Sequence, residues 1–517
     1  MVAKSFFYLL LGLAVLILLV HLGLAPLWGS EGRWAVIARS MLRSGDLLSP
    51  MLGTRSYWDK PLLSYWQILP LSYLNGDVSE FTVRFPPVVW AVVMLLLTYD
   101  LAKRWFDKQT ALISIGTLAT TYSFVFWGRN AQVEMTNAAM ILLCLWYFMK
   151  HKSDHRHTWI YRLGVIMILG ANMKGLVLCA LPVFCILILS IVKWDWSWMP
   201  SIKILIAAGL LSLAGLLALP AAGSIHSATW EPLRDVWREN ILRFFGLYDH
   251  KDPFYTYFVK IWYLAAPWSL LLPVAIVRFL QGARRGIAQI PEVLILFGAI
   301  LLFFTFSGSR RPYYLLPILP FVAILVAGVL REFAIGTLGR GIQGAVRGVG
   351  VFWGLVLIAI SGVSLRFFAG RIDAPCYAFV PLALLGATMI VSTMKEHVWG
   401  MVGSMFAVWL IYVIVAIPLI AEGPNLRTKI AEVKALDRPY AFLNIDDAKL
   451  IFYFNEPRQF FDDETSAFNW AIRTNGVLIT SSGVSNPSWE SLVKDRKWQA
   501  VTPRKPRLLN DGLQGIH

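Results

Sequence analysis

The dominant pattern along the chain is a series of apolar runs separated by short polar segments. A helix of about 20 apolar residues is long enough to cross the hydrocarbon core of a bilayer. The pattern therefore predicts an all-α polytopic membrane protein with about 13 spans. They are expected near residues 6–25, 83–102, 110–127, 134–150, 159–173, 175–192, 202–222, 265–281, 291–307, 313–331, 348–368, 375–394 and 397–421. Around Asn172–Gly175, one long kinked helix would fit as well as two helices.

Basic residues in the short connections predict the orientation of these spans. Lysines and arginines gather on alternate connections and are typical of the cytoplasmic side; examples are Lys103, Arg104, Lys108, Lys193, Arg331 and Lys395. An odd number of spans then places the segments 26–82 and 223–264, together with the tail, on the outer side. We therefore expect residues 1–421 to form a transmembrane domain with two large outer loops.

The pattern changes after residue 422, where apolar runs become too short to span a membrane. It predicts a small α/β domain over 422–517 with a mainly parallel sheet, on the outer side. Strands are expected at 440–445, 459–461 and 476–480, and helices at 447–454, 465–472 and 486–493.

The first outer loop contains two predicted helices. Apolar side chains recur at i, i+3, i+4 and i+7, which indicates a short amphipathic helix at the membrane interface; they are Trp34, Ile37, Ala38 and Met41. Gly45 provides its stop, and Pro61 stands where a second helix, running to about Leu74, would begin.

The composition indicates which kinds of partner this protein has. Only 15% of residues are charged, whereas soluble domains carry about 25%. The net charge of +16 lies mostly in the short loops, so it orients the protein in a bilayer and does not indicate nucleic-acid binding. The four cysteines have no metal-ligand spacing and are interpreted as inert thiols.

Two acidic residues on the predicted outer side are candidates for chemistry. Glu31 follows the first span, and Glu134 opens a later one. Glu31 also suits a helix-first-turn acid, and Glu134 also suits an interfacial side chain that reaches water. Ionisable groups at membrane depth tend to mark function, and two outward carboxylates can bind a cation or act as a general base.

Cations near these acids indicate an anion site. Lys60 stands in the turn Asp59-Lys60-Pro61, which also suits a surface ion pair. Lys174, Arg310 and Arg311 lie on the outer side, against the usual charge rule. A protein that binds phosphate at its outer surface would place cations in this way.

The ordered set of motifs resembles the GT-C glycosyltransferases that use polyprenyl-phosphate-linked sugars. It is most similar to their aminoarabinose-transferase branch, to which protein mannosyltransferases are related. The motifs are S-E-G-R-W-A-x-I-A-R-S-M-L-x-S-G-D from Ser30, Y-W-D-K-P-L-L-S-Y-W from Tyr57, R-N-A-x-x-E from Arg129, N-x-K-G from Asn172 and E-N-x-x-R-F from Glu239.

The resemblance implies an outer active site, a lipid-phosphate-linked donor and inversion at the anomeric carbon. It implies that Glu31 is the catalytic base and that Glu134 supports it. The family's first motif usually has an aspartate where this chain has Ser30, so the identity of the base stays open. Residues expected to contact the donor phosphate or substrate are Arg33, Tyr57, Lys60, Arg129, Lys174, Arg243, Arg310, Arg311 and Tyr313. A divalent metal held by Asp59 and His250 is also implied.

The predicted partners are a polyprenyl-phosphate sugar, the bilayer, and an acceptor that is lipid A, another glycan or a protein. The predicted location is the bacterial inner membrane. Two other functions are compatible with many spans: a lipid-linked-sugar flippase, and a glycan polymerase or ligase with a lipid-diphosphate donor. A transporter usually has internal repeats and helices broken near the midplane, whereas the acids here cluster on one side.

Overall fold

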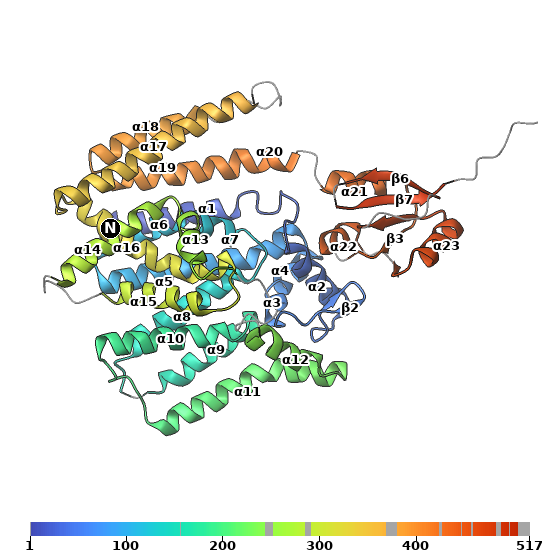
Figure 1. The fold of residues 1–517 in the computed structure, drawn as a ribbon, viewed down its shortest axis with the longest axis horizontal. Helices are drawn as coiled ribbons and strands as arrows, with labels where there is room; N and C mark the ends of the chain where they lie inside the picture. Colours follow the sequence, from blue (N-terminus) through green and yellow to red (C-terminus); the bar gives the residue numbers. More distant parts are fainter. Residues whose placement is uncertain are drawn as a thin grey trace, which may run out of the picture. The chain divides into compact units, whose positions relative to one another are not determined.

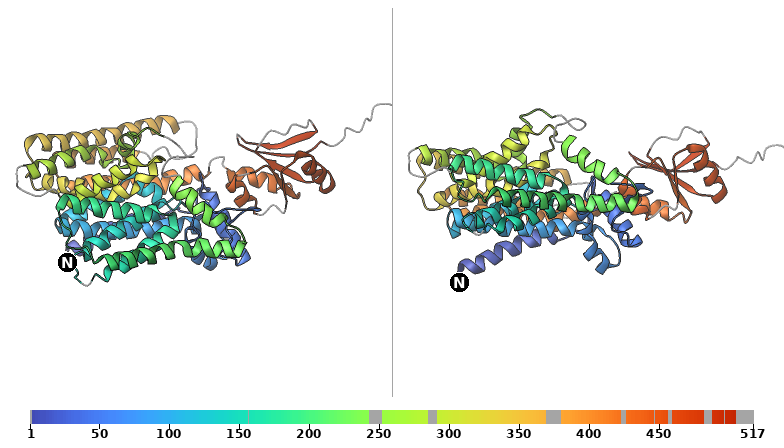
Figure 2. Two further views of the ribbon diagram at one scale, coloured as in Figure 1. Left: turned by 60° about the horizontal axis from the view of Figure 1, so that its bottom comes forward. Right: turned by 90° about the horizontal axis from the view of Figure 1, so that it is seen from below.

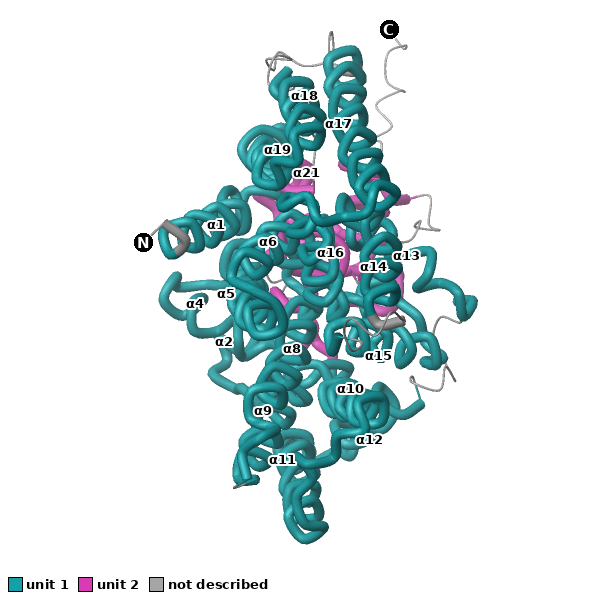
Figure 3. Tube along the Cα trace, turned by 90° about the vertical axis from the view of Figure 1, so that its left-hand side faces the viewer, with its two compact units in different colours: residues 1–25, 38–50, 57–421 teal, residues 26–37, 51–56, 422–517 magenta. Residues whose placement is uncertain are grey.

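The computed structural model describes residues 2–155, 157–242, 252–284, 291–368, 380–422, 426–445, 447–455, 459–481, 488–495 and 497–504. The chain forms two compact units, coloured separately in Figure 3. The first contains residues 1–25, 38–50 and 57–421, and the second contains residues 26–37, 51–56 and 422–517. The tail thus shares its unit with two segments of the first loop.

The first unit is helical, and its long helices run side by side (Figures 1 and 2). In its first half the helices are α1 (Val2–Leu19), α3 (Leu63–Trp66), α4 (Leu69–Asn75), α5 (Glu80–Trp105), α6 (Lys108–Ala119), α7 (Tyr122–Gly128), α8 (Glu134–His151), α9 (Trp159–Lys174), α10 (Val177–Lys193) and α11 (Ile202–Ser227). In its second half they are α12 (Glu231–Trp237), η1 (Arg238–Leu242), α13 (Thr256–Leu264), η2 (Trp268–Leu271), α14 (Leu272–Arg284), α15 (Glu292–Phe306), η3 (Pro312–Ile318), α16 (Leu319–Ala334), α17 (Arg340–Phe368), α18 (Val380–Met394), α19 (Val398–Ile411), η5 (Tyr412–Ala416) and α20 (Ile417–Glu422).

Helix α16 lies at the centre of this unit, whereas α11 lies at its edge (Figure 3). The apolar stretch Pro312–Ala334 is 89% buried, whereas α11 is largely exposed, with only Ala208 and Gly223 buried. Both are strongly apolar, which is expected when the edge of a helical bundle faces lipid tails.

Within the described residues, five helices are long and apolar enough to cross a membrane, and up to seven if each bent pair is one span. This finding confirms a helical protein with several spans, while the number 13 stays a prediction. One bent pair is α6 and α7, which meet at 64°. The indoles of Trp268 and Trp409 donate to the hydroxyl and carbonyl oxygens of Thr120 at this break. These bonds satisfy polar groups at the end of α6 and explain why residues 110–127 do not form one straight helix.

The segment around Asn172–Gly175 forms two helices. Helix α9 ends at Lys174, and Gly175 has a φ of +114°, which a residue with a side chain rarely adopts. The predicted helix from Pro61 to Leu74 is likewise two short helices, α3 and α4.

Glycines allow α17 and α18 to approach closely. A methyl group on Gly354 would lie 2.7 Å from the carbonyl oxygen of Gly386, and one on Gly386 would lie 2.5 Å from that of Gly354. Small residues at a membrane helix interface let two backbones pack together in this way.

We expect Gly354→Leu to destabilise the α17–α18 pair by about 1–3 kcal/mol, because the added side chain overpacks this contact. The apparent melting temperature of the detergent-solubilised protein measures the effect. Gly362→Leu on α17 is the matched control, since a methyl group there would meet no atom within 4 Å. Equal melting temperatures for both variants would contradict the prediction.

The second unit contains a five-stranded sheet with the order β4-β3-β5-β7-β6. Its strands are β3 (Tyr440–Leu443), β4 (Phe460–Phe461), β5 (Val477–Thr480), β6 (Trp489–Lys494) and β7 (Gln499–Pro503), and its helices are α21 (Leu426–Lys434), α22 (Ala448–Phe454) and α23 (Glu464–Thr474). Strands β3, β4 and β5 are parallel, while β7 and β6 are antiparallel to their neighbours. Aspartates begin two helices, since Asp447 accepts from the Lys449 N–H and Asp463 from the Ser466 N–H.

The helix predicted at 486–493 is wrong, because the described part of this segment is strand β6. Its Trp489 joins the core that Ala441, Leu478 and Val501 build. Trp489 and Val493 are four residues apart, so they would also lie on one face of a helix. The segment is a strand because it pairs with β7.

Residues of the first loop complete this unit. The short strands β1 (Met51–Leu52) and β2 (Arg55–Ser56) pair with each other. Helix α2 (Glu31–Ser44) begins in this unit. A methyl group on Gly32 would lie 2.7 Å from the backbone nitrogen of Lys449. The Leu27 N–H donates to the Tyr453 hydroxyl at 2.7 Å. The start of α2 therefore packs tightly against α22.

Candidate functional site

The first part of the candidate site is an ion pair between two helix ends. Glu134 is the first residue of α8 and Lys174 is the last residue of α9, and Lys174 Nζ donates to Glu134 Oε2. The side chains are only 6% and 11% exposed, respectively. Helix dipoles favour an anion at an amino end and a cation at a carboxyl end, so both charges suit their places. Two predicted site residues are thus in direct contact.

Aromatic rings cover the lysine of this pair. Lys174 Nζ lies 5.6 Å from the ring centroids of both Tyr313 and Tyr314, which belong to η3. Trp127 packs on Tyr313 with a centroid separation of 5.1 Å. Such rings attract a cation through their negative faces, so they help to hold Lys174 in a partly desolvated place.

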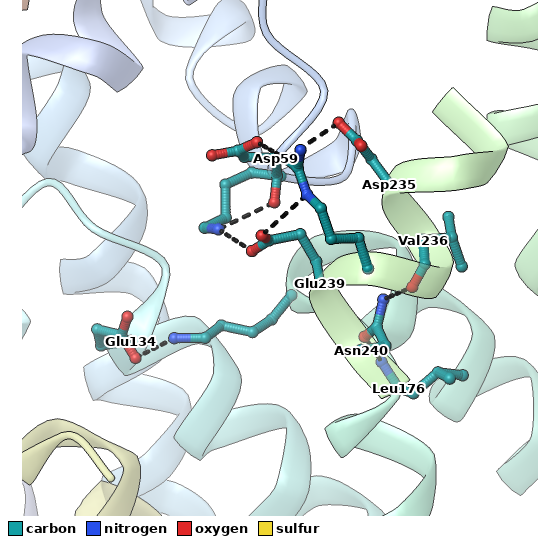
Figure 4. Close-up of polar contacts among 10 residues, drawn as sticks. Asp59, Glu134, Leu176, Asp235, Val236, Glu239 and Asn240 are labelled. Atoms are coloured by element: carbon teal, nitrogen blue, oxygen red, sulfur yellow. Dashed lines mark hydrogen bonds and ion pairs between the residues drawn. The ribbon is translucent and has the colours of Figure 1, made fainter. Parts of the chain in front are cut away.

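A second group of charges surrounds the turn at Asp59 and Lys60. Lys60 Nζ donates to the Asp59 carbonyl at 2.9 Å and to Glu239 Oε2 at 3.1 Å. Arg238 Nη2 donates to Asp59 Oδ1 at 2.7 Å, and it lies 3.5 Å from Asp235 Oδ2. Figure 4 shows these groups together, with the pair of Glu134 beside them. Burial raises the pKa of the Asp235 carboxyl, and the Arg238 charge opposes that shift.

The turn between α9 and α10 is attached to η1 by one amide side chain. Asn240 Oδ1 accepts from the Leu176 N–H at 2.7 Å, and its Nδ2 donates to the Val236 carbonyl at 2.7 Å (Figure 4). This attachment matters because Lys174 stands two residues before Leu176. Element η1 therefore touches both parts of the site, through Glu239 and through Asn240.

We expect Gly175→Ala to lower both stability and activity. The residue has a φ of +114°, and a methyl group there would collide with Asn240 Oδ1. Forcing a side chain into such a conformation costs about 1–3 kcal/mol. Thermal unfolding in detergent measures the loss.

Gly209→Ala on α11 is its matched control, since a methyl group at Gly209 would meet no atom within 4 Å. A Gly175→Ala protein as stable as the Gly209→Ala protein would show that the turn tolerates a side chain.

Glu31 and Arg33 lie in the first turn of α2, in the second unit. Glu31 is 1% exposed, and its Oε2 accepts from the Trp28 N–H at 2.7 Å. This bond is the helix-start role that its position predicts, and it also fixes the carboxylate. The catalytic role of Glu31 stays a prediction.

Two predicted arginines bind backbone carbonyls. The Arg129 guanidinium donates to the carbonyls of Ile17, Leu18 and Val20, at the end of α1. Arg310 donates to the carbonyls of Asp252 and Thr305. These contacts stabilise helix ends and turns. Contact of either arginine with substrate stays a prediction.

The other predicted residues lie in connecting segments. Arg311 directly precedes η3, and the Tyr57 N–H donates to the Pro50 carbonyl at 2.8 Å. Arg243 and His250 lie outside the described residues.

The described residues around Asp59 do not by themselves form a metal site. In the part of the chain that the structure describes, no three His, Cys, Asp or Glu side chains are grouped to hold a metal ion. The Asp59 carboxylate is instead bound by Arg238, which supplies its positive charge. A metal at Asp59 and His250 therefore stays a prediction, and we derive no chemical step from it.

Sequence reasoning missed Arg238, Glu239 and Asn240 as site residues. The motif E-N-x-x-R-F begins at Glu239, and the resemblance implies a donor contact only for its Arg243. The acid and amide of this motif bind other side chains and backbone, which only the folded arrangement reveals.

Comparisons with known proteins agree on one family. Residues 59–219 match the family described as dolichyl-phosphate-mannose-protein mannosyltransferase. The chain is 31% identical to an undecaprenyl phosphate-alpha-4-amino-4-deoxy-L-arabinose arabinosyl transferase of Pseudomonas aeruginosa (strain UCBPP-PA14), over 71% of this chain and 67% of that protein. A protein of the same name from Edwardsiella ictaluri is 29% identical over 75% of this chain and 73% of its own length.

A solved structure shares the fold. The crystal structure of ArnT from Cupriavidus metallidurans bound to undecaprenyl phosphate superposes with a TM-score of 0.72 at 18% sequence identity. It covers 96% of this chain and 98% of that one. The likeness extends over both the helical unit and the small sheet.

Proposed function

This chain belongs to the family of undecaprenyl phosphate-aminoarabinose arabinosyl transferases, and we propose that it transfers a sugar from a polyprenyl-phosphate donor to lipid A on the periplasmic face. It is a multi-pass bacterial membrane glycosyltransferase with a lipid-linked donor. The relatives carry 4-amino-4-deoxy-L-arabinose in their names, so that sugar is the first donor to test. A different glycan or a protein as acceptor is the alternative.

One observation carries the proposal: two lysines, each paired with an acid that is largely shielded from water, stand at neighbouring turns of one unit. Lys60 is paired with Glu239 and Lys174 with Glu134. The departing group of the reaction is a lipid phosphate, on which negative charge develops. Fixed cations aimed at developing charge stabilise the transition state without reorganising.

The proposed reaction is a single displacement. The acceptor oxygen attacks the anomeric carbon, the bond from that carbon to the phosphate oxygen breaks, and the configuration inverts. Glu31 receives the acceptor proton as general base, and Glu134 serves the site through its pair with Lys174. Lys60 and Lys174 stabilise the released phosphate, together with Arg33, Arg243 and Arg311.

The proposed placement in the membrane follows the charge pattern of the loops. We propose 13 crossings with the amino terminus inside, which puts the loops 26–82 and 223–264 and residues 422–517 in the periplasm. The charged groups around Lys60 and the start of α8 are then on the side where a periplasmic acceptor arrives.

The test uses the purified protein in liposomes with undecaprenyl-phosphate aminoarabinose and lipid A. We expect sugar-modified lipid A and one released undecaprenyl phosphate per transferred sugar, both read by mass spectrometry. Undecaprenyl-diphosphate-linked sugar is the comparison donor for a polymerase or ligase. Movement of intact donor between leaflets without cleavage would contradict transfer and identify a flippase.

A further inference from the structure

We propose that Glu239 and Asn240, neighbours in η1, are positioning residues that set where the two site lysines stand. The proposal rests on the proposed function, since it gives both lysines a role at the donor phosphate. It adds that one short helical turn of the second outer loop arranges cations carried by two other segments.

Glu239 fixes the Lys60 ammonium. Their atoms Oε2 and Nζ are 3.1 Å apart, and the side chains are 12% and 22% exposed, so the pair is partly shielded from water. An ammonium has three N–H donors. Among the described residues, two of these donors are directed to Glu239 and to the Asp59 carbonyl. The third can meet a phosphate oxygen from a fixed direction.

Asn240 fixes the backbone that carries Lys174. Its side chain bridges η1 and the following turn, because Oδ1 accepts from Leu176 and Nδ2 donates to Val236. Gly175 lies against the same oxygen so closely that a methyl group has no room. The position of Lys174, one residue earlier, is therefore coupled to η1.

The conformation of η1 explains how one turn serves both lysines. Adjacent residues of a helix point in different directions, so Glu239 and Asn240 reach different neighbours. Residues 238–242 form a π-helix, a rare form that is frequently found at functional sites. Arg238 adds a further restraint through its bond to Asp59, on the same turn as Lys60.

Glu239 acts on rate and binding in opposite senses. Its removal frees Lys60 to move, and misplacement of a catalytic group by about 1 Å can cost about 100-fold in rate. Its removal also deletes a negative charge beside an anion site, which favours donor binding. We therefore expect Glu239→Gln to lower kcat about tenfold without raising the KM for the donor. A purely structural role would reduce the folded amount and leave both constants unchanged.

A double-mutant cycle tests whether Glu239 acts through Lys60. The proteins are the parent, Lys60→Met, Glu239→Gln and the double variant, assayed with undecaprenyl-phosphate aminoarabinose as the probe donor. We expect Lys60→Met to lower kcat about 100-fold and the double variant to match it, because Glu239 then has nothing left to position. Glu231→Gln in α12, whose side chain is exposed, is the matched control and should keep the parent constants.

Three results would overturn the inference: unchanged kcat in Glu239→Gln, higher kcat in that variant, or two fully additive losses. Unchanged activity in Lys60→Met would instead contradict the proposed function. If Glu239→Gln does not fold, Glu239→Asp replaces it, because aspartate keeps the negative charge on a shorter side chain. A lower kcat in Glu239→Asp, with no further loss when it is combined with Lys60→Met, supports the inference.

For Asn240, the variants Asn240→Asp and Asn240→Ala separate its two bonds. Aspartate keeps an oxygen acceptor for the Leu176 N–H, whereas alanine removes it. We expect kcat to fall about tenfold in Asn240→Ala and to recover in Asn240→Asp. Equal kcat in both variants would overturn the role of this bond.

Discussion

Glu31→Gln is expected to lower sugar transfer by about 100- to 10,000-fold while leaving the amount of folded protein intact. A general base contributes a factor of this size, and glutamine cannot accept the acceptor's proton. Its amide oxygen can still accept from the Trp28 N–H, so the start of α2 should be preserved. Single-turnover transfer from radiolabelled undecaprenyl-phosphate sugar measures the loss, and size-exclusion chromatography measures folding.

Glu432→Gln is the matched control for this variant, because it is the same substitution at an exposed position of the same unit. It should transfer sugar at the parent rate. Full activity of Glu31→Gln would contradict its role as base. A complete loss in Glu134→Gln beside an active Glu31→Gln would move that role to Glu134.

Breaking the pair of Glu134 and Lys174 is expected to destabilise the protein by about 3–5 kcal/mol. Each single change, Glu134→Gln or Lys174→Met, leaves one charge buried without its partner, and that is the costly state. The double variant removes both charges, so its stability should return toward that of the parent. Its transfer activity should stay low, because the cation at the donor phosphate is still missing. Thermal unfolding and transfer assays on the same detergent samples separate the two effects.

Arg104→Met provides the matched control for this cycle. Arg104 and Asp100 form an ion pair at 2.6 Å, but both side chains are more than a third exposed. Such pairs contribute about 0–1 kcal/mol, so the melting temperature should change little. If the double variant is as unstable as the single variants, the loss of stability does not come from a buried charge without its partner.

The helical class could be predicted because the bilayer imposes it. A run of about 20 apolar residues has few alternatives to a spanning helix, so most expected spans have a counterpart among the helices. The breaks between consecutive helices could not be predicted, because they depend on contacts with residues far away in the sequence. Thr120 is an ordinary residue for a helix, and its contacts with the distant indoles of Trp268 and Trp409 are not visible in the local sequence.

The candidate site was predictable where charge alone singled out a residue. Glu134, Lys174 and Lys60 are charged residues on the predicted outer side, and the structure pairs Glu134 with Lys174 and Lys60 with Glu239. Asn240 is uncharged, and its role depends on the direction of one side-chain oxygen toward Leu176. Residues whose function is to orient others leave a weaker trace in a single sequence.

The contact between α2 and α22 has a consequence for the order in which the chain is made. The turn that contains Glu31 is synthesised about 400 residues before Ala448 and Lys449, against which Gly32 packs. The turn, which is outside the membrane in the proposed orientation, therefore gains this contact only after α22 has been delivered to the same side. With Glu31 as the proposed base, we expect a nascent chain to stay inactive until α22 has been made.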